Sequence, residues 1–205
     1  ALPRRPPCAM GGACSSSGDE HDAGPEEVHV VRTVRVQREP GKPIGLDLDC
    51  MDGHSARVLA VVDGAVKMTG ANVRQGDHIV AINGDHDVVN IMRHLKESVD
   101  FEMELQHPEE RLVCFEKGGT LGIDYTHAPS GDCLLIRRVL PDGAMCQWNE
   151  ANASDAVKPL DRIVEVNGLR GSWSKILTEI QRTEALRMRI APFPAQRAVP
   201  PPPVT

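Results

Sequence analysis

Hydrophobic and polar residues alternate in several short segments of the chain, and this alternation predicts half-buried strands. It is clearest over residues 44–49, where leucines are separated by aspartates, and over residues 99–105, where Phe101, Met103 and Leu105 share one face. A period of two places the apolar side chains on the buried side of a strand. Similar segments predict further strands over residues 30–37, 58–62, 78–82, 111–116 and 187–190.

Two other segments have the spacing of three and four residues that is typical of an amphipathic helix. In the first segment the apolar residues are Val88, Ile91, Met92 and Leu95. The second segment repeats this spacing 85 residues later, with Trp173, Ile176, Leu177 and Ile180. Asp87 and Ser172 stand immediately before these helices and are expected to be their N-caps. A short helix is also expected after each Asp-Gly-Ala sequence, at residues 63–65 and 142–144.

The segments occur twice in the same order, which indicates an internal duplication. Ile-Gly-Leu at residues 44–46 returns as Leu-Gly-Ile at residues 121–123. Gly-Asp-His-Ile-Val-Ala-Ile-Asn-Gly at residues 76–84 returns as Leu-Asp-Arg-Ile-Val-Glu-Val-Asn-Gly at residues 160–168. The second copy has a small insertion that contains residues 148–152. A repeated unit of roughly 80 residues is the size of a small domain, so we expect two domains rather than a solenoid.

The order of these elements resembles the PDZ family: a strand, a hydrophobic-Gly-hydrophobic loop, two strands, a helix at Asp-Gly-Ala, a strand that ends at Asn-Gly, and a longer helix. The resemblance extends over residues 30–107 and 111–191. It implies an α+β fold that is mostly β, with two small antiparallel PDZ-like β-sandwiches that are each capped by two helices. We therefore divide the chain into PDZ-like domain 1 at residues 28–108 and PDZ-like domain 2 at residues 109–192.

The two ends of the chain lack a periodic apolar pattern. Residues 1–27 are rich in proline, glycine, serine and acidic residues, and residues 193–205 contain a run of four prolines. Such segments bury too little apolar surface to offset their chain entropy, so both tails are expected to be disordered. The proline run is either a polyproline II ligand of a proline-reading domain or a plain linker. Residues 106–109 between the copies are few, which predicts a fixed relative orientation of the two domains.

The composition excludes several classes of protein. The 205 residues include 23 Lys and Arg against 29 Asp and Glu, and the net charge of −6 disfavours nucleic acid as a partner. Aromatic residues make up 3% of the chain, which disfavours a base-stacking platform and predicts aliphatic cores. The longest apolar run, at residues 58–62, is far shorter than the roughly 20 residues of a membrane span.

No sequence pattern indicates catalysis or metal binding. The six cysteines form no Cys-x-x-Cys pair, which favours reduced thiols in a cytoplasmic protein. The histidines form no His-x-x-x-His or His-Glu-x-x-His sequence, and no serine lies in Gly-x-Ser-x-Gly. We therefore expect no enzyme activity, no metal site and no cofactor. Asp52, His54 and Ser55 are expected in a variable loop. The acidic residues without calcium-loop spacing are expected to form a solvated strand face: Glu39, Asp47, Asp49 and Asp52.

The resemblance also implies a mode of binding. In a PDZ-like domain the extended C-terminus of a partner adds as a strand to an open sheet edge, and loop amides hold its terminal carboxylate. A glycine in that loop permits the unusual φ that such an anion site needs. The residues that correspond to these carboxylate-binding loops are Ile44, Gly45, Leu46, Leu121, Gly122 and Ile123. The residues that correspond to the peptide grooves are Leu48, Val88, Met92, Leu95, Tyr125, Trp173, Leu177 and Ile180. Lys42 and Lys117 either attract the carboxylate or are solvated loop lysines.

Specificity in this family depends mostly on the first residue of the longer helix. In the first copy this residue is Val88, which favours an apolar ligand residue two positions before the C-terminus. His86 takes this position instead if the helix begins earlier. In the second copy the residue is Trp173, which either lines a large apolar pocket or lies across the groove and closes it. In the second case domain 2 is structural.

The sequence as a whole indicates a scaffold or adaptor that binds C-terminal peptides of other proteins, with apolar C-termini preferred. The alternative is a regulatory PDZ module of a larger enzyme, such as a protease, whose catalytic domain lies outside this chain. Some partners are expected to be membrane-associated, which would bring a cytoplasmic protein to the membrane cortex. A weak phosphoinositide contact is a further option, through Arg57, Lys67, Arg74, Arg93 and Lys96.

Overall fold

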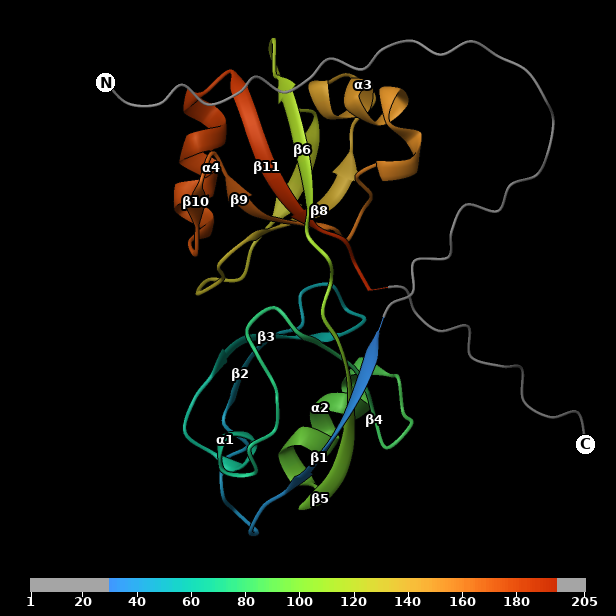
Figure 1. Ribbon diagram of the computed structural model, residues 1–205, viewed down its shortest axis with the longest axis vertical. Coiled ribbons are helices and arrows are strands. Elements are labelled where there is room, and N and C mark those ends of the chain that lie inside the picture. Colours follow the sequence, from blue (N-terminus) through green and yellow to red (C-terminus); the bar gives the residue numbers. More distant parts are fainter. Residues whose placement is uncertain (1–29, 195–205) are drawn as a thin grey trace, which may run out of the picture.

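The computed structural model describes residues 30–194, which fold into two units stacked along the long axis of the molecule (Figure 1). The tails expected to be disordered are residues 1–27 and 193–205. Residues 1–27 and 195–205 lie outside the described residues, whereas the amide of Phe193 donates to Asp161 at 3.0 Å, so the predicted boundary at 193 is wrong. We call residues 30–107 repeat 1 and residues 111–191 repeat 2. In Figure 1 repeat 1 is the lower, blue-to-green unit and repeat 2 is the upper, yellow-to-red unit.

Repeat 1 is built on a five-stranded antiparallel sheet with the strand order β1-β5-β4-β3-β2. Its strands are β1 (Val31–Gln37), β2 (Leu46–Asp49), β3 (Ala56–Val61), β4 (His78–Ile82) and β5 (Asp100–Gln106). Its helices are α1 (Ala65–Met68) and α2 (Val88–Glu97). The predicted alternation over β5 is confirmed, because Phe101, Met103 and Leu105 are all buried.

Repeat 2 has the equivalent strand order β6-β11-β9-β8-β7, and the short β10 (Leu169–Arg170) pairs with β9. The strands are β6 (Arg111–Glu116), β7 (Ile123–Thr126), β8 (Leu134–Val139), β9 (Arg162–Val166) and β11 (Ala185–Ala191). The helices are α3 (Ala144–Ala151), the 3-10 helix η1 (Ala153–Asp155) and α4 (Trp173–Arg182). The insertion of the second copy lengthens α3 and adds η1. The mostly β fold with two antiparallel sheets, each accompanied by two longer or shorter α-helices, is confirmed.

Each sheet closes over an aliphatic core, as the low aromatic content predicted. In repeat 1 the buried cluster has one aromatic member, Phe101, among aliphatic residues and methionine. In repeat 2 the buried cluster consists of aliphatic residues and methionine. The aromatic residues pack against it and are only partly buried: Phe115, Tyr125, Trp148 and Trp173. Within residues 30–194 no helix is long and apolar enough to cross a bilayer.

The starts of the two longer helices differ in a way that the sequence did not reveal. The Asp87 side chain accepts hydrogen bonds from the amides of Val89 and Asn90, both at 3.0 Å, so the predicted cap is confirmed. Ser172 stands at the N-cap of α4 but makes no capping hydrogen bond with its side chain. The helix start at Val88 also shows that the alternative with His86 at the first helical position is wrong.

The two repeats are joined through buried ion pairs. Arg162 on β9 donates to Asp49 at 2.6 Å and to Asp52 at 2.9 Å. These three side chains are at most 2% exposed, so the expectation that Asp49 and Asp52 belong to a solvated strand face is wrong. Arg57 on β3 makes two hydrogen bonds to Asp132 of repeat 2, at 2.7 and 3.1 Å. Carboxylates at alternate strand positions are usually solvated. Here Arg162 of repeat 2 supplies the guanidinium that neutralises the carboxylates of Asp49 and Asp52 in repeat 1.

Candidate functional site

The loop before each edge strand contains a glycine in the left-handed region. Gly45 has φ +84° and Gly122 has φ +74°, which side chains rarely adopt. Each of these glycines also lies against the glycine of the Asp-Gly-Ala sequence. A Cβ built on Gly64 would lie 2.5 Å from the Cα of Gly45, and one built on Gly143 would lie 2.4 Å from the Cα of Gly122. The glycine of each loop thus lies against the glycine at the start of the following helix, and the recurrence of both glycines in the two copies is a sequence signal for this contact.

The carbonyl groups of the loop in repeat 1 are held on its inner side. Pro43 and Ile44 accept hydrogen bonds from Ala65 and Val66 at the start of α1, at 3.1 and 3.0 Å. Gly45 accepts one from Val62, at 3.0 Å. The same bonds recur in repeat 2, where α3 and the end of β8 donate to Thr120, Leu121 and Gly122. Both loops are therefore anchored through their carbonyl oxygens rather than through their amides.

The amides of these loops are left without partners. Four backbone amides of these loops donate no hydrogen bond to a backbone carbonyl or to a side chain within residues 30–194: those of Ile44, Gly45, Leu121 and Gly122. Gly45 and Gly122 are nevertheless buried. Successive backbone N–H groups in such a turn form a concavity with a positive local potential, which suits an anion. Leu46 and Ile123 follow directly as the first residues of β2 and β7.

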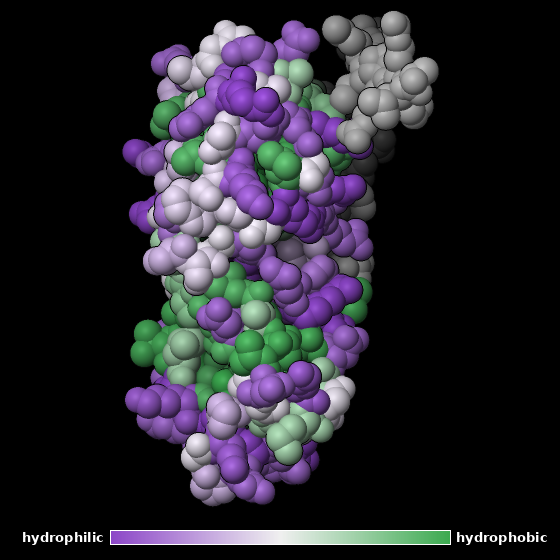
Figure 2. All heavy atoms as spheres, turned by 90° about the vertical axis from the view of Figure 1, so that its left-hand side faces the viewer, coloured by the Kyte–Doolittle hydropathy of each residue, from purple (hydrophilic) through white to green (hydrophobic). Residues whose placement is uncertain are grey.

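In repeat 1 the loop leads into the open edge of the sheet. β2 stands at the end of the strand order, with β3 on its other side. Leu48 of β2 and Val88 of α2 are half-buried, and Met92 is 39% exposed, whereas Leu95 is buried in the core. The Sγ of Cys50, directly after β2, lies 3.5 Å from the Sδ of Met92. Figure 2 shows hydrophobic residues gathered on the lower unit, on the side where Figure 1 places β2, β3 and α1.

In repeat 2 two rings bridge the equivalent space. His127 is the first residue after β7, and Trp173 is the first residue of α4. Their rings are stacked with centroids 3.5 Å apart and an interplanar angle of 9°. The indole Nε1 of Trp173 also donates to the carbonyl of Pro129, at 3.3 Å. The stack therefore joins the end of β7 to the start of α4, while Tyr125 and Leu177 pack half-buried against the core and Ile180 is buried in it.

The basic residues singled out in the sequence do not gather at either loop. Lys117 donates to the carbonyl of Ile180 at 3.0 Å and its side chain is 10% exposed, so it is part of the packing of α4. Lys42 is exposed. Arg57 is buried against Asp132, which removes it from the suggested phosphoinositide set, and Lys67 is paired with Asp63 at 2.8 Å.

A buried polar cluster lies where repeat 1 meets repeat 2. Asp52, His54 and Ser55 lie in the loop between β2 and β3, as expected, but Ser55 Oγ is 2.9 Å from Asp52 and 2.8 Å from the Nδ1 of His78. In a serine nucleophile triad the imidazole stands between serine and aspartate. Here the hydroxyl stands between the other two groups, and Ser55 is 1% exposed, so the cluster is structural. Burial, with Arg162 nearby, lowers the pKa of His78 to about 3.

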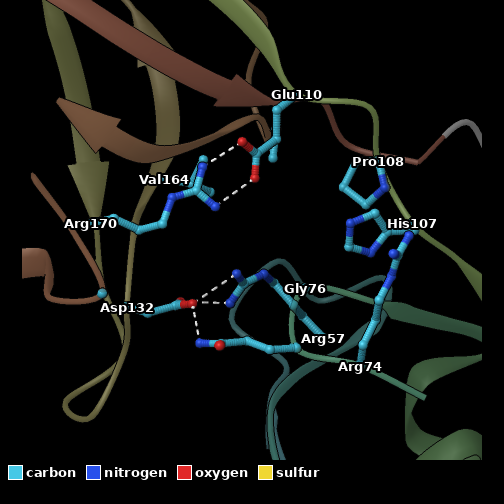
Figure 3. Close-up of a pocket in the computed structure, with 12 residues that line it drawn as sticks. Arg57, Arg74, Gly76, His107, Pro108, Glu110, Asp132, Val164 and Arg170 are labelled. Carbon is cyan, nitrogen blue, oxygen red and sulfur yellow. Dashed lines mark hydrogen bonds and ion pairs between the residues drawn. The ribbon is translucent and has the colours of Figure 1, made fainter. Parts of the chain in front are cut away.

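A polar hollow of about 410 Å³ lies beside this cluster, lined by both repeats (Figure 3). Arg57 points toward Asp132, and Arg170 pairs with Glu110 across it. The guanidinium groups of Arg57 and Arg170 are thus neutralised by carboxylates, whereas Arg74, which also lines the hollow, approaches Asp77 only to 3.7 Å and is 60% exposed. Among the described residues, no group of three or more His, Cys, Asp and Glu side chains could hold a metal ion.

Comparison with known proteins finds similar solved structures, but no match to a family model or to a curated protein. The PDZ domain from choanoflagellate GIPC bound to GAIP peptide is 28% identical, over 39% of this chain and 92% of that chain, with a TM-score of 0.34. INAD PDZ45 in complex with NG2 peptide is 18% identical, over 87% of this chain and 98% of that chain, with a TM-score of 0.36. INAD PDZ45 in complex with NORPA CC-PBM is 16% identical, over 82% and 94% of the two chains, with a TM-score of 0.34. Each of these three solved structures is described as PDZ.

Proposed function

We propose that this chain is a protein-interaction scaffold that binds the C-terminal segments of partner proteins in the groove of repeat 1. The observation that carries the proposal is the set of unpaired amides at Ile44 and Gly45, next to the open edge of β2. A terminal carboxylate would accept hydrogen bonds from these two amides and from Leu46, while the ligand backbone adds to β2. Gly45 is buried, and a buried N–H group without a partner costs free energy, so a bound carboxylate would supply the hydrogen bond that this amide lacks.

The walls of this groove favour an apolar ligand residue two positions before the C-terminus. Val88 opens α2 and has no hydrogen-bonding group for a serine or threonine hydroxyl of the ligand. Met92 and Cys50 add polarisable, weakly polar sulfur atoms at the far end. His86, which could have offered a ring nitrogen, precedes the helix and places its Nδ1 3.0 Å from the carbonyl of Val80.

We assign a structural role to repeat 2. Its loop has the same glycine pair and the same unpaired amides, but the stack of His127 on Trp173 joins its edge strand to its helix. A ligand strand would have to separate the two rings before it could extend along β7. One peptide should therefore bind per chain.

The experiment is a selection of random C-terminal peptides on the whole chain, followed by fluorescence polarisation and calorimetry with the best peptide. The free carboxylate should bind about tenfold or more tightly than the same peptide with a C-terminal amide, because charge-assisted hydrogen bonds are lost. Exchange of valine for threonine at the third position from the end should weaken binding. No enrichment, or equal binding of the amide, would overturn the proposal. A stoichiometry of two peptides would overturn only the structural role of repeat 2.

A further inference from the structure

The end of the edge strand in repeat 1 is folded around two carboxylates. Asp49 is the last residue of β2, and its Oδ1 accepts a hydrogen bond from the amide of Met51 at 2.8 Å. The Oδ1 of Asp52 accepts hydrogen bonds from the amides of His54 and Ser55, both at 2.8 Å. These bonds determine the backbone course of residues 49–55. The position of this segment therefore depends on where the two carboxylates are held.

Both carboxylates are held by a single group of repeat 2. The Nη1 of Arg162 donates to the Oδ2 of Asp49 at 2.6 Å, and its Nη2 donates to the Oδ2 of Asp52 at 2.9 Å. Without this guanidinium, two buried carboxylates would face each other with no cation between them. Such a pair is strongly destabilised in a low-dielectric site, and the segment would open toward water.

Cys50 connects this ion pair to the groove. It lies between the two carboxylates in sequence, and its Sγ contacts the Sδ of Met92 on α2 at 3.5 Å. A ligand strand that adds antiparallel to β2, with its carboxylate at Leu46, passes Asp49 and Cys50 with residues upstream of its C-terminus. The distance between β2 and α2 at this end therefore determines how much room the upstream residues of the ligand have.

We propose that Arg162 of repeat 2 is a positioning residue for the groove of repeat 1, because it holds the end of β2 at the distance from α2 that a bound peptide requires. This inference rests on the proposed function. It assigns a specific task to repeat 2, which is to shape the groove of its neighbour rather than to bind a second peptide.

The test compares the whole chain with Arg162→Gln, using the octapeptide form of the best selected C-terminus in fluorescence polarisation. Arg162→Gln should weaken binding about tenfold, in the range expected when a coupling residue outside the site is changed. Arg162→Lys, which keeps one charge but not both hydrogen bonds, should restore part of the affinity. Asp132→Asn is the matched control, because it removes the other ion pair between the described parts of the two repeats, and the Asp132 carboxylate itself makes no hydrogen bond to residues 49–55. This control should bind within twofold of the wild type.

A second variant covers the case in which Arg162→Gln does not fold, as judged by circular dichroism. Asp49→Asn keeps the shape of the side chain and removes one of the two charges, so it should also weaken binding several-fold. Binding within twofold of the wild type, in a folded Arg162→Gln or Asp49→Asn chain, would overturn the inference alone. If Asp132→Asn weakens peptide binding as much as Arg162→Gln does, the inference is overturned as well, because any loosening of the junction would then weaken binding. Absence of peptide binding by the wild type would overturn the proposed function and this inference together.

Discussion

The buried His78 should make the stability of the chain sensitive to mild acid. Burial lowers its pKa from an ordinary 6.5 to about 3, and Arg162 acts in the same direction, while Asp52 opposes this change. A histidine with a lowered folded-state pKa contributes stability above the unfolded-state pKa of 6.5, and this contribution is lost as the pH falls toward 3. If His78 is protonated completely in both states, the free energy of unfolding falls by about 5 kcal/mol, because each tenfold change in proton affinity is worth about 1.4 kcal/mol.

Between pH 7 and pH 5 the free energy of unfolding should fall by about 2 kcal/mol. Over this range His78 takes up a proton in the unfolded chain but not in the folded chain. Urea unfolding followed by circular dichroism would measure it as a fall in midpoint of about 1 M, for a slope of about 2 kcal/mol per M. His78→Asn should remove this part of the pH dependence. His86→Asn, at an exposed position, should leave it as in the wild type. If His78→Asn loses as much stability as the wild type between pH 7 and pH 5, the imidazole is not held neutral by its site and the reasoning fails.

The paired glycines and the helix caps give two further predictions. Gly64→Ala should cost about 1–3 kcal/mol in urea unfolding, because its Cβ would meet backbone atoms of Gly45 at 2.5 Å, and it should abolish binding of the selected peptide. Gly143→Ala, with a contact of 2.4 Å in repeat 2, should cost a similar amount and leave peptide binding intact; a loss of binding in both variants would show that the effect is not local to the loop. Asp87→Ala should destabilise the chain by about 1 kcal/mol, since its side chain caps α2. Ser172→Ala should change stability by less than about 0.5 kcal/mol, and equal costs for the two caps would contradict the hydrogen bonds described.

Local patterns predicted the elements of this chain well, because each rests on contacts within a few residues. The alternation in β5 and the spacing in α2 identified buried residues such as Met103 and Ile91. The duplication also predicted that the two copies contain equivalent elements in the same order along the chain, and both sheets have equivalent strand orders. The first residues of α2 and α4 were also placed correctly, at Val88 and Trp173.

The sequence could not predict the partners of side chains across the junction. Arg162 is separated from Asp49 by 113 residues and from Asp52 by 110, so no periodicity connects them. Aspartates at alternate positions of a short strand look solvated when the neighbouring domain is not known. The stack of His127 on Trp173 was missed for a related reason, since a tryptophan at a helix start is compatible with either an open or a closed groove.

Position 78 of repeat 1 and position 162 of repeat 2 are equivalent in the duplication, and both are buried at the junction. One copy therefore contributes a neutral imidazole and the other a guanidinium. Two copies of repeat 2 joined in the same way would bring two guanidinium groups to this place, and two copies of repeat 1 would leave Asp49 and Asp52 without any cation. The divergence of this one position makes the two halves of the chain complementary to each other rather than to themselves, and so disfavours the association of like repeats from two molecules.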